Sequence, residues 1–295
     1  MKEFTFVDTS HITLEEKSYI YGLLLSDGTM HIVNSEAYTG QVQLEVGEKD
    51  EDIVDKLCKI VPYSTKRKRI RNTNFKENHH SVVFVVSRQY FIKDLIDFGF
   101  PIENKTINSR PPVVEYDKNA FWRGVLDGDG SLGIRHNSNG NLEAYLSLTT
   151  KSELLKDAFC KYLASITGRQ YHPRRNKRDN IYNIGCGGHI ACKVLKELYK
   201  DCTIYLNRKY NNFLECIKWE QENSIPKRNT SGVIGVGIDK NKGKWMAYIM
   251  INKKNINLGL YIDKRDAIIA RLQAEKEYFG EFALQKHLFK EYGLE

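Results

Sequence analysis

The stretch YIYGLLLSDG at residues 19–28 decides the fold, because a similar stretch, WRGVLDGDG, follows at residues 122–130. Each is an apolar run of helical character that ends in Asp-Gly. Small residues four positions apart let two helix backbones approach closely, and a glycine inside a helix costs about 1 kcal/mol relative to alanine. We therefore predict two helices packed against each other through small residues that recur in both copies, at Gly22, Ser26, Gly124 and Gly128.

Two aspartates, Asp27 and Asp129, close the two runs. A carboxylate at the C-terminal end of a helix meets the negative end of the helix dipole, and a bound cation reverses that penalty. One apolar helix that ends in Asp-Gly is usually a core helix followed by a turn. The pair of copies with matching small residues instead favours two carboxylates held together, which is a geometry for binding divalent metal ions.

Both stretches resemble the signature motif of LAGLIDADG homing endonucleases, in the form with two motifs on one chain. The second copy matches the motif at Gly124, Asp127, Asp129 and Gly130. The first has Leu25 and Ser26 where the motif has Asp and Ala, but it keeps Asp27 and the following glycine. PIENKT at residues 101–106 and YLNRKY at residues 205–210 are also similar to the phage and intron type of this family.

The resemblance implies an α+β fold of two pseudo-symmetric αββαββα half-domains, residues 1–112 and 113–222, which form a DNA-binding saddle. It implies that Asp27 and Asp129 bind two or three Mg²⁺ ions, for which Mn²⁺ would substitute. It also implies cleavage of both DNA strands across the minor groove, with short 3′ overhangs. The family places a basic residue near each metal site, after the last strand of each half. Lys193 is the candidate in the second half and Arg88 the weaker one in the first, although a helix lysine such as Lys193 can also simply face solvent.

The hydrophobic pattern after each motif is repeated as well. Extended segments at residues 29–33, 41–46 and 81–86 alternate with helices at 51–60 and 90–97. The second half has extended segments at 132–134, 144–148 and 181–184, and helices at 152–166 and 189–199. One α+β unit is thus used twice. Lys105 and Lys209 fall at corresponding places and serve as structural residues or phosphate contacts.

Basic segments occupy equivalent positions in the two halves, at residues 64–76 and 172–178. A charge run is usually a solvated face, but these runs lie inside a folded unit. Two antiparallel basic ribbons would fit the major groove, where Arg, Lys, Asn and Gln read base edges. The candidate DNA contacts are Lys66, Arg67, Arg69, Arg71, Arg174, Arg175 and Arg178.

The composition is consistent with a polyanionic partner, since 45 basic against 37 acidic residues give a net charge of +8. No apolar run approaches the ~20 residues that span a membrane, and the N-terminus lacks the pattern of a secretion signal. Six cysteines without a Cys-x-x-Cys pair indicate reduced thiols. We expect a cytoplasmic or organellar protein that is phage- or intron-encoded and not secreted, and a monomer, because one chain carries both motifs.

A third region follows residues 223–230, which are expected to be a linker because apolar periodicity is lost there and Pro226 occurs. Residues 231–285 read as three strands and a helix with Asp263 as its N-cap, and residues 286–295 as a tail. This region resembles the DNA-binding domain of the plant ethylene-response factors (the APETALA type), on residues that include Ser231-Gly232, Gly235-Val236, Lys244-Trp245 and Leu258-Gly259.

In that family the sheet lies in the major groove, which makes candidate contacts of Lys240, Lys242, Lys244, Tyr248, Met250, Asn252 and Lys254. Trp245 can stack on DNA or pack against the helix, and we favour packing because one large aromatic side chain must cover a small sheet. Arginines that read guanine in the plant domains are absent at Gly237 and Met250.

Two functions remain open. The first is a site-specific double-strand DNA homing endonuclease with metal ions held by the two motif aspartates. The alternative is a cleavage-inactive DNA- or RNA-binding protein on the same scaffold, such as an intron maturase or a repressor. Loss of either aspartate would favour the alternative, and both are present.

Overall fold

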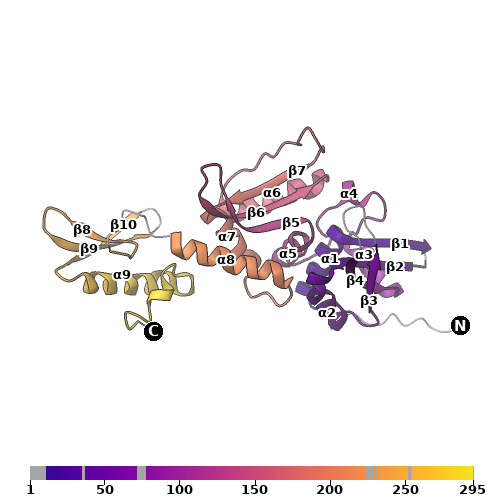
Figure 1. Cartoon of the computed structure of the whole chain (residues 1–295), viewed down its shortest axis with the longest axis horizontal. Coiled ribbons are helices and arrows are strands. Elements are labelled where there is room, and N and C mark those ends of the chain that lie inside the picture. The colour runs from indigo at the N-terminus through magenta and orange to yellow at the C-terminus, as the bar shows by residue number, and fades with distance from the viewer. Residues whose placement is uncertain are drawn as a thin grey trace. The chain divides into compact units, whose positions relative to one another are not determined.

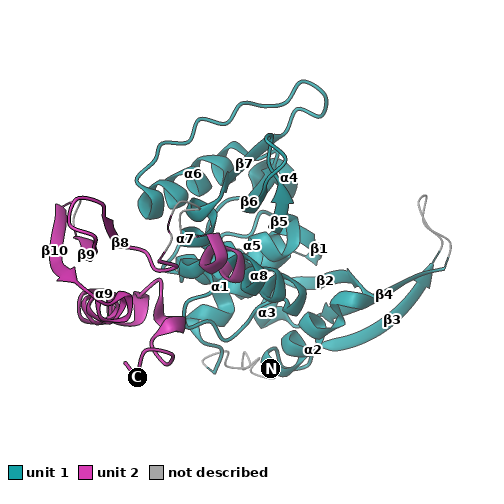
Figure 2. Cartoon of the chain, turned by 60° about the vertical axis from the view of Figure 1, so that its left-hand side comes forward, with its two compact units in different colours: residues 1–216 teal, residues 217–295 magenta. Residues whose placement is uncertain are grey.

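The computed structural model describes residues 11–34, 37–71, 78–223, 229, 231–251 and 254–294. The chain forms two compact units, residues 1–216 and residues 217–295 (Figure 2). Among the described residues, no helix is both long enough and apolar enough to cross a membrane.

Two helices, α1 (Leu14–Asp27) and α5 (Lys118–Asp129), form the centre of the first unit (Figure 1). The start of α1 is fixed by a capping box, in which Thr13 Oγ1 accepts from the Glu16 amide at 3.2 Å and the Thr13 amide donates to Glu16 at 2.9 Å. At the start of α5, the Asp117 side chain accepts from the Ala120 amide at 2.8 Å. Such caps satisfy backbone donors that have no partner within the helix.

Glycines allow α1 and α5 to touch through their backbones. A Cβ on Gly22 would lie 2.3 Å from the carbonyl oxygen of Phe121, and a Cβ on Gly124 would lie 2.2 Å from that of Tyr19. Near the helix ends, a Cβ on Gly128 would lie 2.4 Å from the Cβ of Ser26. The four small residues expected at a helix interface therefore all lie in this contact. The contacts of Gly22 and Gly124 are reciprocal, because each glycine meets a backbone carbonyl of the other helix.

The first sheet of this unit is antiparallel, with the strand order β1-β2-β4-β3. Its inner face buries Val42, Leu44, Val82, Phe84 and Val86, all of which are fully buried. Figure 2 shows β3 and β4 extending as a long two-stranded ribbon. The elements of this half are β1 (Gly28–Asn34), β2 (Thr39–Gly47), η1 (Glu48–Asp50), α2 (Glu51–Ile60), β3 (Thr65–Arg71), β4 (His79–Val86) and α3 (Gln89–Phe98).

The second sheet has three antiparallel strands in the order β5-β6-β7. Residues 172–178 are irregular apart from a single bridge between Arg175 and Tyr182, so the second basic ribbon expected there does not form. This half contains β5 (Gly130–His136), β6 (Leu142–Thr150), α6 (Glu153–Thr167), β7 (Tyr182–Gly187) and α7 (His189–Leu198). The short helix α4 (Lys105–Asn108) precedes it, and α8 (Asn207–Asn223) follows it.

The second unit is a three-stranded antiparallel sheet, β10-β9-β8, on one side of a helix (Figure 1). Asp263 caps the helix by accepting from the Arg265 amide at 2.6 Å, as expected. Trp245 is partly buried and packs against the core of the unit, which is the arrangement that we favoured. The elements are β8 (Val236–Asp239), β9 (Lys244–Ile251), β10 (Lys254–Tyr261), α9 (Lys264–Phe279), η2 (Gly280–Phe282) and η3 (Lys286–Leu288).

The boundary between the two units falls within α8. Most of the expected linker at residues 223–230 lies outside the described residues.

Candidate functional site

Asp27 and Asp129 are the last residues of α1 and α5, at the end of the glycine contact. The chain then turns in the same way in both copies. Gly28 and Gly130 take extended backbone angles, and their amides still donate to the helix carbonyls of Leu24 and Leu126. Each strand therefore begins directly after the aspartate, which fixes the carboxylate where helix end and sheet meet.

The two carboxylates influence each other. Although both residues are exposed, the protein packed around their carboxyl groups displaces water. This loss of solvation and, second to it, the charge of Asp27 raise the pKa of Asp129 to about 6, whereas Lys105 and Lys209 oppose the shift. Loss of solvation also raises the pKa of Asp27, again opposed by these two lysines. A raised pKa means that the ionised form is disfavoured without a compensating cation.

Lys105 and Lys209 hold the C-terminal ends of the two helices. The Lys105 ammonium donates to the carbonyl oxygens of Ser26 at 2.8 Å and Gly28 at 2.5 Å. Lys209 does the same at α5, where it donates to the carbonyl oxygens of Leu126, at 3.2 Å, and Gly130. Each ammonium offsets the negative end of a helix dipole. Both lysines thus have a structural role, which was one of the two predicted for them, while their charges also act on the aspartates.

A cavity lies beside each aspartate, with charged and hydroxyl side chains in its lining. Each cavity combines one of the two helix-terminal aspartates, the end of the second strand of a sheet and residues at the start of the next helix. The cavity at Asp27 is lined by Leu23, Asp27, Glu45, Val46, Gly47, Asp50, Ile53, Asp127, Gly128, Leu206 and Arg208. The cavity at Asp129 is lined by Leu25, Ser26, Lys105, Thr106, Ser109, Asp129, Thr149, Thr150, Lys151, Leu155 and Ile181.

The two cavities differ in charge. In the Asp27 cavity, Asp50 precedes α2 and is held by Arg208 through two hydrogen bonds of 2.8 and 2.9 Å. The corresponding residue before α6 is Ser152, which is buried and donates its hydroxyl to the carbonyl oxygen of Ser109 at 2.6 Å. The first cavity therefore has a bidentate ion pair at a position where the second half has a neutral hydroxyl.

Asp127, the other motif aspartate of the second copy, is a buried residue. One of its carboxylate oxygens accepts from the Tyr19 hydroxyl at 2.6 Å and from the Leu206 amide at 2.8 Å. Its second oxygen has no hydrogen-bond partner within the described structure, and Asp127 lines the Asp27 cavity. Burial raises its pKa to about 6. Asp127 thus joins α5 to α1, while its second carboxylate oxygen is buried without a hydrogen-bond partner among the described residues.

The predicted DNA contacts of the first half divide between two faces of the sheet. Arg67, Arg69 and Arg71 alternate along β3 on the face opposite the core, where Arg69 and Arg71 reach Glu45 at 2.9 and 3.0 Å. Lys66 points the other way, because alternate strand residues point to opposite faces. It pairs with Glu51 and Asp55 of α2 and therefore lies on the other face of the sheet from the arginines; its contact with DNA stays a prediction.

Strand pairing adds polar residues to the arginine face that the sequence alone did not single out. They lie on β1 and β2, and alternation along those strands would have been the signal to find them. These residues are Thr29, His31, Gln41 and Gln43.

The predicted contacts of the second half are not arranged on a strand. Arg175 lies over the Tyr182 ring, with its guanidinium 4.7 Å from the ring centre, and is 3.6 Å from Glu153. Arg178 pairs with its neighbour Asp179 at 2.9 Å, and Arg174 is exposed. The outer face of the second sheet instead carries Ser131, Arg135 and Tyr145.

Lys193 and Arg88 lie outside both cavities. Lys193 is exposed on α7, and Arg88 is exposed before α3, over the Tyr63 ring at 4.6 Å. The basic residues that line the cavities are Arg208 in the first, and Lys105 and Lys151 in the second. Lys193 remains a prediction, and these other three positions are the better-placed basic groups.

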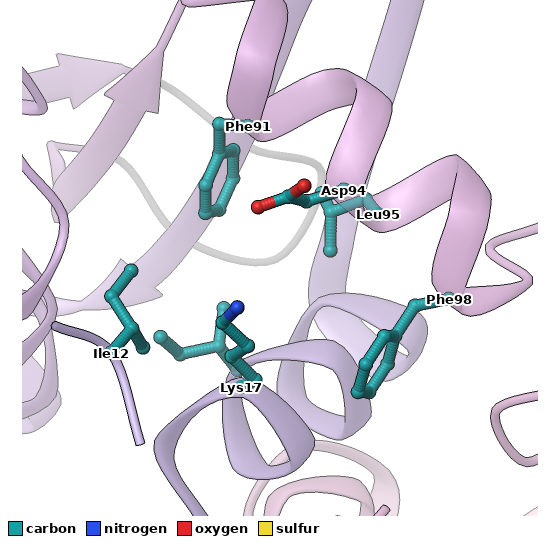
Figure 3. A pocket seen from close by; sticks show the side chains of 7 residues that line it. Ile12, Lys17, Phe91, Asp94, Leu95 and Phe98 are labelled. Atoms are coloured by element: carbon teal, nitrogen blue, oxygen red, sulfur yellow. The ribbon is translucent and has the colours of Figure 1, made fainter. Parts of the chain in front are cut away.

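A further pocket lies between the start of α1 and α3, at the opposite end of α1 from Asp27. Figure 3 shows Lys17 and Asp94 among the apolar side chains of Ile12, Phe91 and Phe98. Its apolar lining offers no carboxylate pair.

In the second unit, the candidate contacts Lys244, Tyr248 and Met250 share the sheet face that points away from α9. Lys240 and Lys242 lie in the turn between β8 and β9, and Lys254 begins β10. Asn252 lies outside the described residues.

Within the described part of the chain, no group of three or more His, Cys, Asp or Glu side chains is arranged to hold a metal ion.

No protein-family model matches the chain. No curated protein matches it either. Among solved structures, the chain is similar to the LAGLIDADG meganuclease I-AabMI bound to uncleaved DNA, with 10% identity, 70% of this chain and 91% of that chain covered, and a TM-score of 0.49. The chain is also similar to the LAGLIDADG homing endonuclease I-GzeII in complex with its DNA target. The identity is 13%, the alignment covers 73% of this chain and 94% of that chain, and the TM-score is 0.45. A third similar structure is the homing endonuclease I-WcaI bound to its DNA recognition sequence. The identity is 16%, the alignment covers 68% of this chain and 87% of that chain, and the TM-score is 0.46. The structural neighbours of this chain are thus LAGLIDADG homing endonucleases, which align with about 70% of it.

Proposed function

We propose that this protein is a site-specific homing endonuclease that hydrolyses phosphodiester bonds on both strands of double-stranded DNA. The observation that carries the proposal is the placement of Asp27 and Asp129 at the adjoining ends of α1 and α5, each beside a cavity. The motif resemblance assigns the same two residues. Because one chain supplies both aspartates, we expect the protein to act as a monomer.

The donor set suits Mg²⁺. Magnesium binds oxygen ligands and is usually held by one or two carboxylates, with substrate phosphates and water completing the shell. Asp27 and Asp129 would supply those carboxylates, and Asp127, whose second oxygen is buried without a partner among the described residues, is one of the residues that line the Asp27 cavity. Bound divalent ions would lower the pKa of the attacking water and stabilise charge on the scissile phosphate and the leaving oxygen.

The protein's own residues would fix the geometry of this reaction. Lys105 and Lys209 keep the helix ends, and therefore the two carboxylates, in place. Their positive charges also favour ionised aspartates and attract the phosphate backbone. On the outer face of the first sheet, Arg67, Arg69 and Arg71 would contact phosphates and base edges. The second sheet offers fewer charges, so the target site is expected to be imperfectly symmetric.

The proposal is tested with DNA that joins the sequences on either side of the element that carries this reading frame. We expect a double-strand cut with short 3′ overhangs in Mg²⁺ or Mn²⁺, and no cleavage in excess EDTA. The products are mapped by primer extension on both strands. Tight, specific binding without cleavage in either metal would contradict the proposal and support the binding-only alternative.

The raised carboxylate pKa values predict a pH dependence. A raised folded-state pKa means that the carboxylate form needed for a cation is dominant only above that pKa, which for Asp129 is about 6. The single-turnover cleavage rate at fixed Mg²⁺ is therefore expected to fall about ten-fold per pH unit below pH 6. Raising the Mg²⁺ concentration should move the midpoint to lower pH, because the metal ion competes with the proton.

DNA binding measured by gel shift in EDTA serves as the control for this profile. It should change much less than the cleavage rate between pH 5 and pH 7. A cleavage rate that is constant across that range would contradict the assignment of these carboxylates to metal binding.

A further inference from the structure

The sheet of the second unit has one face covered by α9 and one face left open. Ala247 and Ile249 of β9 are buried in the core of this unit. Alternation along the strand therefore turns the residues between them to the open face. Pairing with β8 and β10 extends this face, which consists of Gly237, Asp239, Lys244, Met246, Tyr248, Met250, Asn255, Asn257 and Leu260.

The open face is unusual in its chemistry. It contains one ammonium group, at Lys244, and no guanidinium group, since residues 231–261 contain no arginine. Two carboxamides, Asn255 and Asn257, lie two residues apart on the same face of β10 and are both exposed; Asn257 Oδ1 accepts from the Gly259 amide at 3.0 Å. They are paired across the strands with Met250 and Tyr248. The centre of the face is thus a patch of methyl, aromatic and carboxamide groups.

The surroundings of the patch are positively charged. Between residues 231 and 261 there are five lysines and a single acidic residue, Asp239. Lys240 and Lys242 lie at one turn of the sheet, and Lys254 begins β10. A rim of this charge favours a polyanion over a protein surface. Because the proposed function already takes double-stranded DNA as the ligand of the chain, the same duplex is the polyanion that we assign to this face.

Base recognition in the major groove depends on side-chain chemistry. Guanine is read mainly by Arg or Lys, adenine by the carboxamide of Asn or Gln, and the thymine methyl group by apolar side chains. The open face has two carboxamides and several apolar side chains, of which Met250 keeps 58% of its surface exposed. Of the side chains that read guanine, this face has one lysine, Lys244, and no arginine.

We propose that this sheet face recognises an A·T-rich segment of duplex DNA that lies outside the segment bound by the first unit. Asn255 and Asn257 would contact adenine, while Met246, Met250 and Tyr248 would contact thymine methyl groups. This inference rests on the proposed function, because it takes DNA as the ligand of the chain. It adds a base preference and assigns that preference to named residues.

The test is selection of bound duplexes from a randomised DNA library. The full-length chain is used with both Asp27→Asn and Asp129→Asn, so that bound DNA stays uncut. We expect two blocks of preferred sequence. The inner block is the segment bound by the first unit, and the outer block, bound by the sheet face of the second unit, consists mainly of A·T pairs. In a chain with Asn255→Ala and Asn257→Ala, the preference in the outer block should fall about ten-fold, while the inner block is unchanged.

Matched variants separate recognition from folding. Gln273→Ala removes an exposed carboxamide from α9, on the other side of this unit, and should leave both blocks unchanged. Met250→Arg places a guanine-reading side chain on the open face and should convert one outer position to a G·C preference of about ten-fold. Because this variant gains a preference, misfolding cannot produce its expected result.

Several outcomes overturn the inference. The assignment of this face is wrong if the outer block is rich in G·C pairs, or if only the inner block shows a sequence preference. It is also wrong if the outer A·T block persists when both asparagines are replaced. In each of these results the inner block is still selected, so the proposed function stands. Failure to select any duplex sequence would instead overturn the proposed function, and this inference with it.

Discussion

Replacing Asp129 with asparagine is expected to lower the rate of double-strand cleavage by about 10³-fold or more, and Asp27→Asn should have an effect of the same order. Asparagine keeps the shape of the side chain but loses the negative charge that would hold a divalent ion. Both aspartates end helices whose positions are fixed by the glycine contact. Cleavage of each strand is measured separately on end-labelled DNA at saturating protein.

The same substitutions are expected to stabilise the fold slightly. The raised pKa of Asp129 shows that its charge is disfavoured in the folded state, so stability falls as pH rises from about 4 towards 6. At pH 7, Asp129→Asn should therefore increase the free energy of unfolding by about 1 kcal/mol, a value reduced for the exposure of the carboxylate. Thermal melting measures this increase, with Asp179→Asn as an exposed control. A variant that is inactive because it is destabilised would contradict the assignment.

The second large effect is expected from Gly124→Val. The added Cβ would lie 2.2 Å from the carbonyl oxygen of Tyr19 and 2.8 Å from the amide nitrogen of Leu23, so the helices would have to separate along their whole contact. Backbone atoms cannot move aside as flexible side chains do. We expect a loss of at least about 4 kcal/mol of stability, or insoluble protein, because overpacking and loss of the central contact combine. Gly22→Val should behave alike, since its Cβ would lie 2.3 Å from the Phe121 carbonyl oxygen.

Gly47→Ala is the matched control in the same unit. Its added Cβ would meet only the Cγ of Lys49, at 4.0 Å. Chemical denaturation should therefore give a free energy of unfolding within about 1 kcal/mol of that of the unmodified chain. If Gly124→Val were tolerated as well as Gly47→Ala, the backbone contact between α1 and α5 would not be needed for folding.

The central helix pair could be predicted because its signal is local and repeated. Glycine at two equivalent helical positions is costly unless something approaches closely, and the structure places a backbone carbonyl at each. The basic segments were harder to interpret. Lys66 and Arg67 are neighbours in sequence but lie on opposite faces of β3. Applying the period of two to this strand would have separated them.

The second basic segment resembles the first in composition, but its structure differs for a local reason. Pro173 has no amide hydrogen to donate to a sheet, and the neighbouring strand β7 has only six residues. Only the bridge at Arg175 remains. Similarly, nothing in the sequence linked Asp50 to Arg208, because the two residues are 158 positions apart. Pairs of this kind depend on the folded topology rather than on any local pattern.

The ion pair between Asp50 and Arg208 also makes the two halves of the duplication non-interchangeable. The position that corresponds to Arg208 in the first half is Asn104, next to Lys105, and the position that corresponds to Asp50 in the second half is Ser152. A chain built from two copies of the first half would bury an aspartate without its guanidinium partner, which is strongly unfavourable. A chain built from two second halves would leave the arginine facing a hydroxyl. A symmetric dimer of either half would therefore lack this ion pair.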